Sequence, residues 1–288
     1  PKDKSQNVVF VAMSGGVDSS VAAYLLKEQG YFVVGVFMKN WSFDVENIKQ
    51  CPLYQDYLDM VKVCKNLKIP YLVFSFEKEY RKRVIDEFFS GYKSGITPNP
   101  DVLCNTEIKF DMFLKEAIKL DADYIATGHH IRSRCVSSKS VKPGSDKNKK
   151  TKICPDYQLL KGKDSVKDQT YFVYGLTQDQ LSKCIFPIGE YDKSEIREIA
   201  EKEGIPTAKK RDSQGICFIG RIDVKDFLKT RLPEKKGDIV TKDGKKLGKH
   251  EGSWFYTIGQ RRIEGLSGTP RPYYVIGKNA KKNQVIVG

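Results

Sequence analysis

A glycine turn between an apolar strand and an apolar helix is the feature that most constrains this chain. Residues 8–13 are rich in β-branched side chains, the turn Ser14-Gly15-Gly16-Val17-Asp18-Ser19 follows, and a segment of helical character continues to Leu26. Glycines allow positive φ and close backbone approach, so successive N–H groups can face one concavity above a helix N-terminus. The pattern therefore predicts a turn that binds a phosphate group.

Asp18 makes the predicted phosphate site unusual. A carboxylate beside a phosphate is repelled unless Mg²⁺ lies between them, so we expect Asp18 to be a magnesium ligand. The turn lacks the lysine of the G-x-x-x-x-G-K-[ST] pattern, which excludes the phosphate loop of kinase-like and GTPase-like proteins. SGGVDS instead resembles the pyrophosphate-binding loop of ATP pyrophosphatases, which place AMP on a substrate oxygen. A tight turn in an ordinary β-α unit is the alternative.

Charge and cysteine usage narrow the class of partner. The 50 Lys and Arg residues outnumber the 36 Asp and Glu residues, which gives a net charge of +14 and favours a polyanion such as RNA or DNA over small molecules alone. A generally basic compartment is the alternative. The seven cysteines form no C-x-x-C pair, which argues against structural zinc and a disulfide framework. No apolar run is long enough to predict a membrane span.

The remaining pattern predicts an α/β fold with a parallel sheet, followed by a smaller β-rich domain. An apolar strand at 31–38 completes a βαβ unit, and strands at 70–76 and 124–127 fit the same sheet. Ligands of such sheets lie beyond the carboxyl ends of the strands, so Met38 and Gly128 are expected near the glycine turn. Core filling explains Met38 equally well. Past residue 210, a hairpin turn at Asp243-Gly244 and strands at 254–257 and 273–276 indicate the second domain.

Two cysteines stand in segments that look like sites. Two prolines in segment 97–105 predict a stiff extended loop, with Cys104 just before a helix that begins at Thr106, where the helix N-terminus would lower the thiol pKa. Asp101 adds a carboxylate, although a surface loop with an incidental cysteine is the alternative. Cys217 lies at the centre of a second, glycine-bounded loop at 211–220.

Three further segments leave their roles open. His129 and His130 follow the strand at 124–127 and could be acid/base groups, polyanion contacts or exposed imidazoles. Six lysines and one acid between residues 139 and 152 predict a flexible insertion in a hairpin. Asp192 and Glu195 form a capping-box pattern that predicts a helix ending at Gly204.

Eight short blocks along the chain carry a family resemblance. They are AMSGGVDSSVA, FMKNW, TPNPDVLCN, IKFD, YIATGHH, KDQTYFVYGL, DSQGICFIG and YTIGQRR. Block by block and in order, they are similar to the tRNA-specific 2-thiouridylase family, whose two cysteine blocks are absent from other pyrophosphate-loop enzymes. The resemblance implies ATP-dependent sulfur transfer to C2 of the wobble uridine of tRNA, through an adenylated uridine and a cysteine persulfide. The histidine pair and the lysine-rich insertion depart from the common bacterial pattern.

The resemblance also implies roles for individual residues. Cys104 is the expected nucleophile, Cys217 the expected persulfide carrier and Asp101 the candidate acid/base group. A Cys104–Cys217 disulfide would form if Cys104 frees the sulfur from Cys217. ATP is expected at Ala12, Met13, Ser14, Gly15, Gly16, Val17, Asp18, Ser19, Met38 and Gly128. The tRNA and its target uracil are expected at Asn99, Pro100, Asp101, His129, Lys167, Asp168 and Gln169.

The resemblance sets the expected domains, partners and location. We expect a pyrophosphate-loop domain over residues 1–210, related to the adenine nucleotide alpha hydrolases, a β-rich domain over 211–288, and no C-terminal β-barrel in this chain. The expected partners are tRNA, with lysine, glutamate and glutamine acceptors, and an upstream persulfide donor, with no DNA and no membrane. A basic chain with an insertion and no initiator Met indicates a mitochondrial form, and the bacterial cytoplasm is the alternative.

Two other functions are compatible with parts of the sequence. A pyrophosphatase that ligates or amidates a small molecule would use the same turn and leave both cysteine loops incidental, and it would turn over ATP without RNA. A tRNA-binding accessory protein with an inactive nucleotide site would show no exchange of ATP with pyrophosphate.

Overall fold

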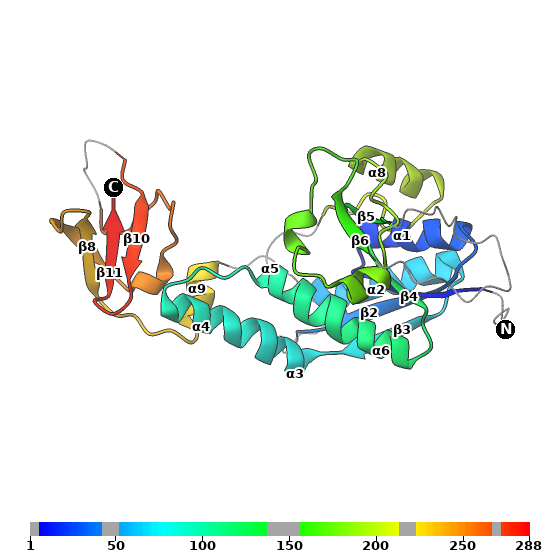
Figure 1. Ribbon diagram of the computed structural model, residues 1–288, viewed down its shortest axis with the longest axis horizontal. Coiled ribbons are helices and arrows are strands. Elements are labelled where there is room, and N and C mark those ends of the chain that lie inside the picture. Colours follow the sequence, from blue (N-terminus) through cyan, green and yellow to red (C-terminus); the bar gives the residue numbers. More distant parts are fainter. Residues whose placement is uncertain (1–5, 42–51, 137–155, 213–222, 267–271) are drawn as a thin grey trace. The chain divides into compact units, whose positions relative to one another are not determined.

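The computed structural model describes residues 6–41, 52–136, 156–212, 223–266 and 272–288 (Figure 1). The chain divides into two compact units. Unit 1 contains Pro1–Tyr80 and Asp101–Gln214, and unit 2 contains Arg81–Pro100 and Gly215–Gly288. The chain thus enters unit 2 at Arg81, returns to unit 1 at Asp101 and ends in unit 2. The expected domain boundary, with one domain over residues 1–210 and the other over 211–288, remains a prediction.

A parallel sheet forms the centre of unit 1, as the sequence predicts. Its strands run in the order β3-β2-β1-β4-β7, and every described neighbouring pair is parallel. Their bounds are β1 Val8–Ala12, β2 Phe32–Lys39, β3 Tyr71–Ser75, β4 Tyr124–Thr127 and β7 Cys184–Ile185. Strand β1 is fully buried at the centre because it has a partner on each side, and its β-branched side chains pack on both faces.

Helices cover both faces of this sheet. On one face, α1 (Val17–Glu28), α2 (Pro52–Leu67) and α8 (Lys193–Lys202) share one apolar cluster with the strands, built around buried residues such as Val11, Leu26 and Met60. On the other face, the ring of Phe113 at the start of α6 (Phe113–Lys119) lies 6.1 Å from the Phe74 ring of β3. Successive side chains of a strand point to opposite faces of the sheet, so the strands contribute to two separate apolar layers.

The helix that carries Cys104 begins earlier than the sequence predicts. Helical structure starts with α5 (Pro100–Leu103), continues as the π-helical segment η3 (Cys104–Met112) and passes into α6. The predicted stiff loop up to Asn105 and helix start at Thr106 are therefore wrong. Proline is favoured at the first position of a helix, where its missing N–H has no intrahelical partner, so Pro100 begins the helix and does not extend a loop.

After β4, a hairpin and three helical segments complete the described part of unit 1. Strands β5 (Ile131–Cys135) and β6 (Tyr157–Lys161) pair as an antiparallel hairpin, and the predicted insertion at 139–152 lies outside the described residues. After β6 come the short helical turn η4 (Thr170–Phe172) and α7 (Gln178–Ser182). Helix α8 begins where expected, because Glu195 Oε2 accepts the N–H of Asp192 at 2.6 Å, and Gly204 takes the positive φ of +61° that ends a helix.

Unit 2 combines a helical segment with a four-stranded sheet. Its helical segment passes from the π-helical η2 (Arg81–Ile85) into α4 (Asp86–Ser94), directly after α3 (Glu77–Tyr80), which ends the first segment of unit 1. Phe88 and Phe89 of α4 contact Phe227 of α9 (Val224–Lys229), with ring centroids 6.0 and 5.1 Å apart. The sheet has the order β10-β11-β8-β9. Its bounds are β8 Gly237–Thr241, β9 Lys246–His250, β10 Val275–Asn279 and β11 Gln284–Val287.

One predicted strand of unit 2 is wrong. Residues 254–257 were expected to be extended, but Ser253–Phe255 forms the short helical turn η5. Side chains bind the backbone here in place of a neighbouring strand: Asn283 Oδ1 accepts the N–H of Ser253 at 3.0 Å, and His250 Nδ1 accepts that of Gly252 at 3.0 Å. The hairpin turn at Asp243-Gly244 is confirmed, with φ of +87° at Gly244.

Within the described residues, no helix has the length and apolar character needed to cross a bilayer.

Candidate active site

The glycine turn requires glycine at one of its two glycine positions. Gly15 adopts φ of +72°, and a Cβ there would lie 2.3 Å from the carbonyl oxygen of Asp56 in α2, so both conformation and space require glycine. Gly16 is different, because its φ of −95° is open to any residue. Ser19 Oγ accepts the N–H of Ser14 at 3.2 Å and donates to the carbonyl of Gly16 at 3.2 Å. Two hydroxyl contacts thus hold the turn at the N-terminus of α1.

Gly128 lets a second strand end approach this turn. A Cβ at Gly128 would lie 2.6 Å from the N atom of Ser19 and 2.7 Å from the carbonyl carbon of Asp18. The backbone after β4 therefore lies directly against the first turn of α1. The sequence predicts this meeting of β1 and β4 at one edge, since parallel neighbours end on the same side.

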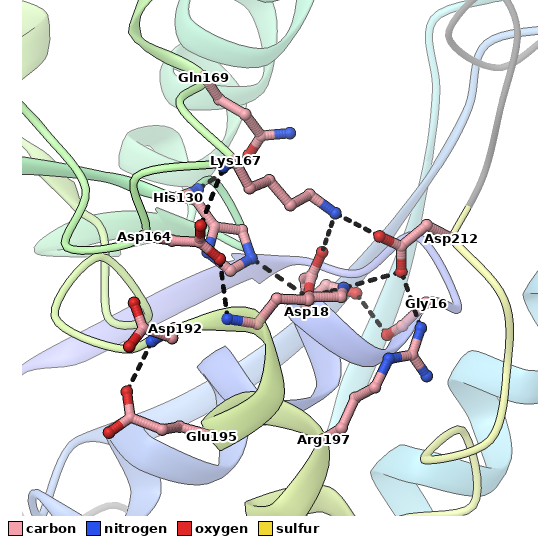
Figure 2. A network of polar contacts seen from close by, with 12 residues as sticks. Gly16, Asp18, His130, Asp164, Lys167, Gln169, Asp192, Glu195, Arg197 and Asp212 are labelled. Atoms are coloured by element: carbon pink, nitrogen blue, oxygen red, sulfur yellow. Dashed lines mark hydrogen bonds and ion pairs between the residues drawn. The ribbon is translucent and has the colours of Figure 1, made fainter.

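Asp18 is the centre of a cluster of charged side chains (Figure 2). Its carboxylate lies 2.5 Å from Lys193 Nζ, 3.5 Å from Lys167 Nζ and 3.5 Å from His130 Nε2. Burial acts to raise the pKa of Asp18, but the hydrogen bond with His130 and the charges of Lys193 and Lys167 outweigh it. The pKa of Asp18 is therefore held well below its ordinary value, and the carboxylate is ionised at neutral pH.

Asp212 supplies a second carboxylate to this cluster. It forms ion pairs with Lys167, with Lys193 at 2.8 Å and with Arg197 at 3.2 Å. Burial opposes ionisation, yet the hydrogen bonds from Lys167 and Lys193 lower the pKa of Asp212 below its ordinary value. The two lysines thus bridge two carboxylates that stand 194 positions apart in sequence, at residues 18 and 212.

Asp164 fixes the backbone of both lysines. Its Oδ1 accepts the N–H groups of Val166 at 2.8 Å and Lys167 at 3.0 Å, and its Oδ2 accepts that of Lys193 at 2.9 Å. The hydrogen bond from Lys193 is the main reason why the pKa of Asp164 is below its ordinary value. One buried carboxylate therefore joins the segment before η4 to the start of α8, which positions Lys167 and Lys193 together.

The two histidines are buried, which excludes the interpretation as exposed imidazoles. His129 lies with Nδ1 2.7 Å from Thr127 Oγ1, and its pKa is held well below its ordinary value, chiefly by burial and then by the charge of Lys109. His129 is therefore neutral at pH 7. His130 faces Asp18 with its ring, and its backbone N–H is bound by Gln169 Oε1 at 2.8 Å.

Residues 167–169, which are expected to contact tRNA, lie at or next to the Asp18 cluster. Lys167 lies in the Asp18 cluster and Gln169 binds the backbone of His130. Asp168 Oδ1 accepts the N–H and the hydroxyl of Thr170 at 3.0 and 2.6 Å, and these hydrogen bonds lower the pKa of Asp168. Their contact with tRNA stays a prediction, as does that of His129.

The expected nucleotide-binding residues differ in accessibility. Of the turn, Ser14 is exposed and Gly16 and Asp18 are half-buried, so a ligand can reach these three directly. The side chains of Ala12, Met13, Val17, Ser19 and Met38 are buried, and Gly15 is buried as well. Met38 packs in β2 opposite Phe74 of β3, which fits core filling. Any contact of the buried residues with ATP remains a prediction.

The structure also places the expected uracil and sulfur residues. Cys104 is fully buried at the start of η3, and Asp101 is half-buried in α5. The predicted position of Cys104 in front of a helix N-terminus is wrong, because four helical residues precede it. Asn99 and Pro100 are assigned to unit 2, and Asp101 begins the second segment of unit 1. Cys217 lies outside the described residues.

The sequence reasoning missed Lys193, Arg197, Asp212 and Asp164 as parts of the site. One local signal points to Lys193. It is the first residue of α8, directly after the cap, where the helix dipole disfavours a positive charge. A lysine at such a position indicates that carboxylates or phosphates lie nearby.

Comparison with known proteins gives matches over almost the whole chain. A family model described as tRNA methyl transferase HUP domain matches residues 7–221, and one described as tRNA methyl transferase PRC-barrel domain matches residues 225–288. A tRNA-specific 2-thiouridylase MnmA of Halalkalibacterium halodurans is 50% identical over 287 residues, covering 100% of this chain and 72% of that protein. The tRNA-specific 2-thiouridylase MnmA of Staphylococcus aureus strain Newman is 50% identical over 279 residues, covering 97% of this chain and 70% of that protein. A solved structure of a 4-thiouridine synthetase–RNA complex with bound ATP is 17% identical in sequence. The match covers 78% of this chain and 50% of the synthetase chain, with a TM-score of 0.42.

Proposed function

The chain belongs to the tRNA-specific 2-thiouridylase family, and on that premise we propose that it uses ATP to transfer sulfur to C2 of the wobble uridine of tRNA. The observation that carries the proposal within the structure is the Asp18 cluster. Two lysines and a glycine turn meet at the N-terminus of α1, and their N–H groups are the donors that phosphate oxygens of a nucleotide need. The ionised carboxylate of Asp18 beside them can hold a metal ion.

ATP solves the chemical difficulty of this reaction. The C2 oxygen of uracil is a poor leaving group, so it first attacks the α-phosphorus of ATP and pyrophosphate leaves. AMP, attached through that oxygen, then becomes the leaving group when sulfur attacks C2. The backbone N–H groups at the start of α1 and the lysines of the cluster stabilise the charge that develops on the departing pyrophosphate.

We propose that Mg²⁺ binds with the nucleotide. Mg²⁺ commonly uses one or two carboxylates together with substrate phosphates, and the half-buried, ionised Asp18 fits that donor set. Bound there, the ion would neutralise phosphate charge. Asp18 would exchange its lysine partners for the ion, and those lysines would then be available to phosphate oxygens.

The sulfur step is proposed for Cys217 and Cys104. A persulfide on Cys217 attacks C2, and AMP leaves with the former uracil oxygen. The thiolate of Cys104 then attacks the sulfur atom of Cys217, the S–S bond of the persulfide breaks, and the sulfur that leaves stays on C2 with the electron pair. The resulting Cys104–Cys217 disulfide needs two electrons from an external thiol reductant. The second route, in which Cys104 frees sulfide before attack on C2, gives the same products. Asp101 would serve as acid/base group.

Finer points of partners and location are also proposals. We propose lysine, glutamate and glutamine tRNAs as acceptors and a separate persulfide donor as the sulfur source. The two relatives described above come from bacteria, which supports the bacterial cytoplasm for this chain, and the mitochondrial location stays a prediction. Mass spectrometry of tRNA from a deletion strain, with fractionation where the cell has organelles, tests both points.

Two competing interpretations are less well supported. Family matches over residues 7–221 and 225–288 include both cysteine segments, which an ATP-dependent ligase or amidase of small molecules would not require. The model descriptions mention methyl transfer, yet the common biological methyl donor, S-adenosylmethionine, carries no phosphate for the turn and the lysines to bind.

Substitution of Cys217 separates the two halves of the reaction. With tRNA present, Cys217→Ser should release pyrophosphate from ATP at a rate near that of the wild type but form no 2-thiouridine. Cys184→Ala is a control variant that should retain thiolation, because Cys184 is a buried free thiol in β7. Full thiolation by Cys217→Ser, or pyrophosphate release by the wild type at equal rates with and without tRNA, would contradict the proposal.

A further inference from the structure

We propose that Lys193 is a pyrophosphate-binding residue: its ammonium group pairs with Asp18 and Asp212, and the β- and γ-phosphates of ATP replace Asp18 as its partner. The inference deepens the proposed function and rests on it, because it concerns the same ATP site. It assigns a role to a residue that lies 175 positions from the turn it contacts.

The ammonium group of Lys193 lies beside the predicted phosphate site. Lys193 Nζ lies 2.5 Å from Asp18 Oδ1 and 2.8 Å from Asp212 Oδ1, and its side chain is only 19% exposed. Asp18 is the second residue of α1, beside the N–H groups that face the predicted phosphate concavity. A cation within hydrogen-bond reach of Asp18 is therefore at the right place to meet a phosphate bound by those groups.

Positive side chains outnumber the carboxylates that they contact in this cluster. Three cations, Lys167, Lys193 and Arg197, surround the two carboxylates Asp18 and Asp212. Arg197 is already bound to the carbonyl oxygens of Ala208 and Lys210, at 3.0 and 3.2 Å, so it serves the local fold. Among the residues that the structure describes, the ion pairs of the two lysines are with carboxylates, and a phosphate oxygen can replace a carboxylate oxygen as the acceptor of an ammonium group.

Lys193 stands at the end of α8 that is unfavourable for a positive charge. Lys193 is the first residue of α8, where the positive end of the helix dipole repels its charge, and its backbone is fixed there by Asp164 Oδ2. A lysine at this position is therefore stable only beside anionic groups, which are Asp18 and Asp212 in the structure. The same fixed backbone allows Lys193 to keep its bond with Asp212 while it turns from Asp18 to a phosphate oxygen.

The proposal also separates Lys193 from a lysine in a similar setting. Lys163 lies near the same end of α8 and pairs with Glu195 at 3.0 Å and Asp192 at 3.7 Å, but it has no contact with Asp18 or Asp212 among the described residues. Lys163 is therefore a matched control, since its removal also takes one cation from the start of α8.

The experiment measures binding, without any turnover. Isothermal titration calorimetry on the full chain gives the Kd for inorganic pyrophosphate with Mg²⁺, for a non-hydrolysable ATP analogue and for AMP. Lys193→Met should weaken binding of pyrophosphate and of the ATP analogue about ten- to a hundredfold, as expected for one charge-assisted contact, and leave AMP binding within about twofold. Lys193→Arg should recover most of the affinity, and Lys163→Met should match the wild type.

The binding measurements distinguish a failure of the inference about Lys193 from a failure of the proposed function. Wild-type affinity for pyrophosphate in Lys193→Met overturns the inference and leaves the proposed function intact, whereas a wild-type chain that binds neither ATP analogue nor pyrophosphate overturns the proposed function. An equal loss of AMP and pyrophosphate affinity in Lys193→Met shows a general structural effect and also overturns the inference. If Lys193→Met is unfolded by circular dichroism, Lys193→Arg decides, because a pyrophosphate affinity in that variant more than about tenfold below that of the wild type contradicts a role for the charge at this position.

Discussion

Replacement of Asp164 by asparagine should loosen both lysines of the site at once. The carboxylate accepts three backbone N–H groups, from Val166, Lys167 and Lys193, at 2.8 to 3.0 Å. Asparagine retains one acceptor oxygen. If that oxygen keeps the two bonds from Val166 and Lys167, the amide NH₂ group faces the N–H of Lys193, donor against donor.

The size of the effect follows from these three bonds. Losing the bond to Lys193 costs about 1.5–3 kcal/mol for a charged acceptor, and the two remaining bonds weaken because the acceptor becomes neutral. We therefore expect the free energy of unfolding of unit 1 to fall by about 2–4 kcal/mol. With a urea dependence of about 1–3 kcal/mol per molar, the midpoint should fall by about 1 M or more.

Tryptophan fluorescence can follow unit 1 alone. Trp41 belongs to unit 1 and Trp254 to unit 2, so urea unfolding in a Trp254→Phe background reports on the unit that contains Asp164. The exposed Asp179 offers a control, since Asp179→Asn should change the free energy of unfolding by no more than about 0.5 kcal/mol. If Asp164→Asn unfolds at the midpoint of the control, and the amide of Lys193 exchanges with solvent at its wild-type rate, the argument that Asp164 holds the lysines is refuted.

Three further predictions concern the turn, its charge and the core. Gly128→Ala should weaken ATP binding at least about tenfold in calorimetry, because its Cβ would lie 2.6 Å from the N atom of Ser19; equal affinity would contradict the close approach. The lowered pKa of Asp18 means that its stabilisation is complete above the ordinary carboxyl pKa of about 4 and is lost as the pH falls below it. Unfolding of the wild type should therefore depend more steeply on pH below about 4 than that of Asp18→Asn, and parallel curves would contradict the pairing. Phe113→Ala should lower the free energy of unfolding by about 3–5 kcal/mol in urea titrations, because the ring is fully buried, and a loss under about 1 kcal/mol would contradict its place in the core.

Much of unit 1 could be predicted because local patterns and long-range structure agree there. β-branched runs, a glycine turn and a capping box each have one favourable conformation, and the parallel order of the strands brings their carboxyl ends to one edge. The meeting of Gly128 with the turn followed from that order alone.

The errors arose where one residue type allows two conformations. Pro100 fits an extended loop and the first turn of a helix equally well, and the wrong choice moved the expected helix start past Cys104. Residues 254–257 have strand-forming side chains, but side-chain acceptors from Asn283 and His250 satisfy the backbone nearby.

The charged cluster could not be predicted from periodicity. Asp18, Asp164, Lys193 and Asp212 lie on separate segments whose approach is set by tertiary packing, and no pattern in the sequence fixes their distances. Only the lysine at the first position of α8 gave a local sign of it.

The central claim is that ATP activates the C2 oxygen of a uridine in tRNA, and isotope transfer tests it directly. A tRNA anticodon stem-loop that carries ¹⁸O at C2 of the target uridine is incubated with the chain, ATP, Mg²⁺ and a persulfide donor, and the AMP is analysed by mass spectrometry. Because the uracil oxygen leaves with AMP, we predict that AMP carries the label in proportion to the 2-thiouridine formed. Unlabelled AMP alongside 2-thiouridine would contradict the account.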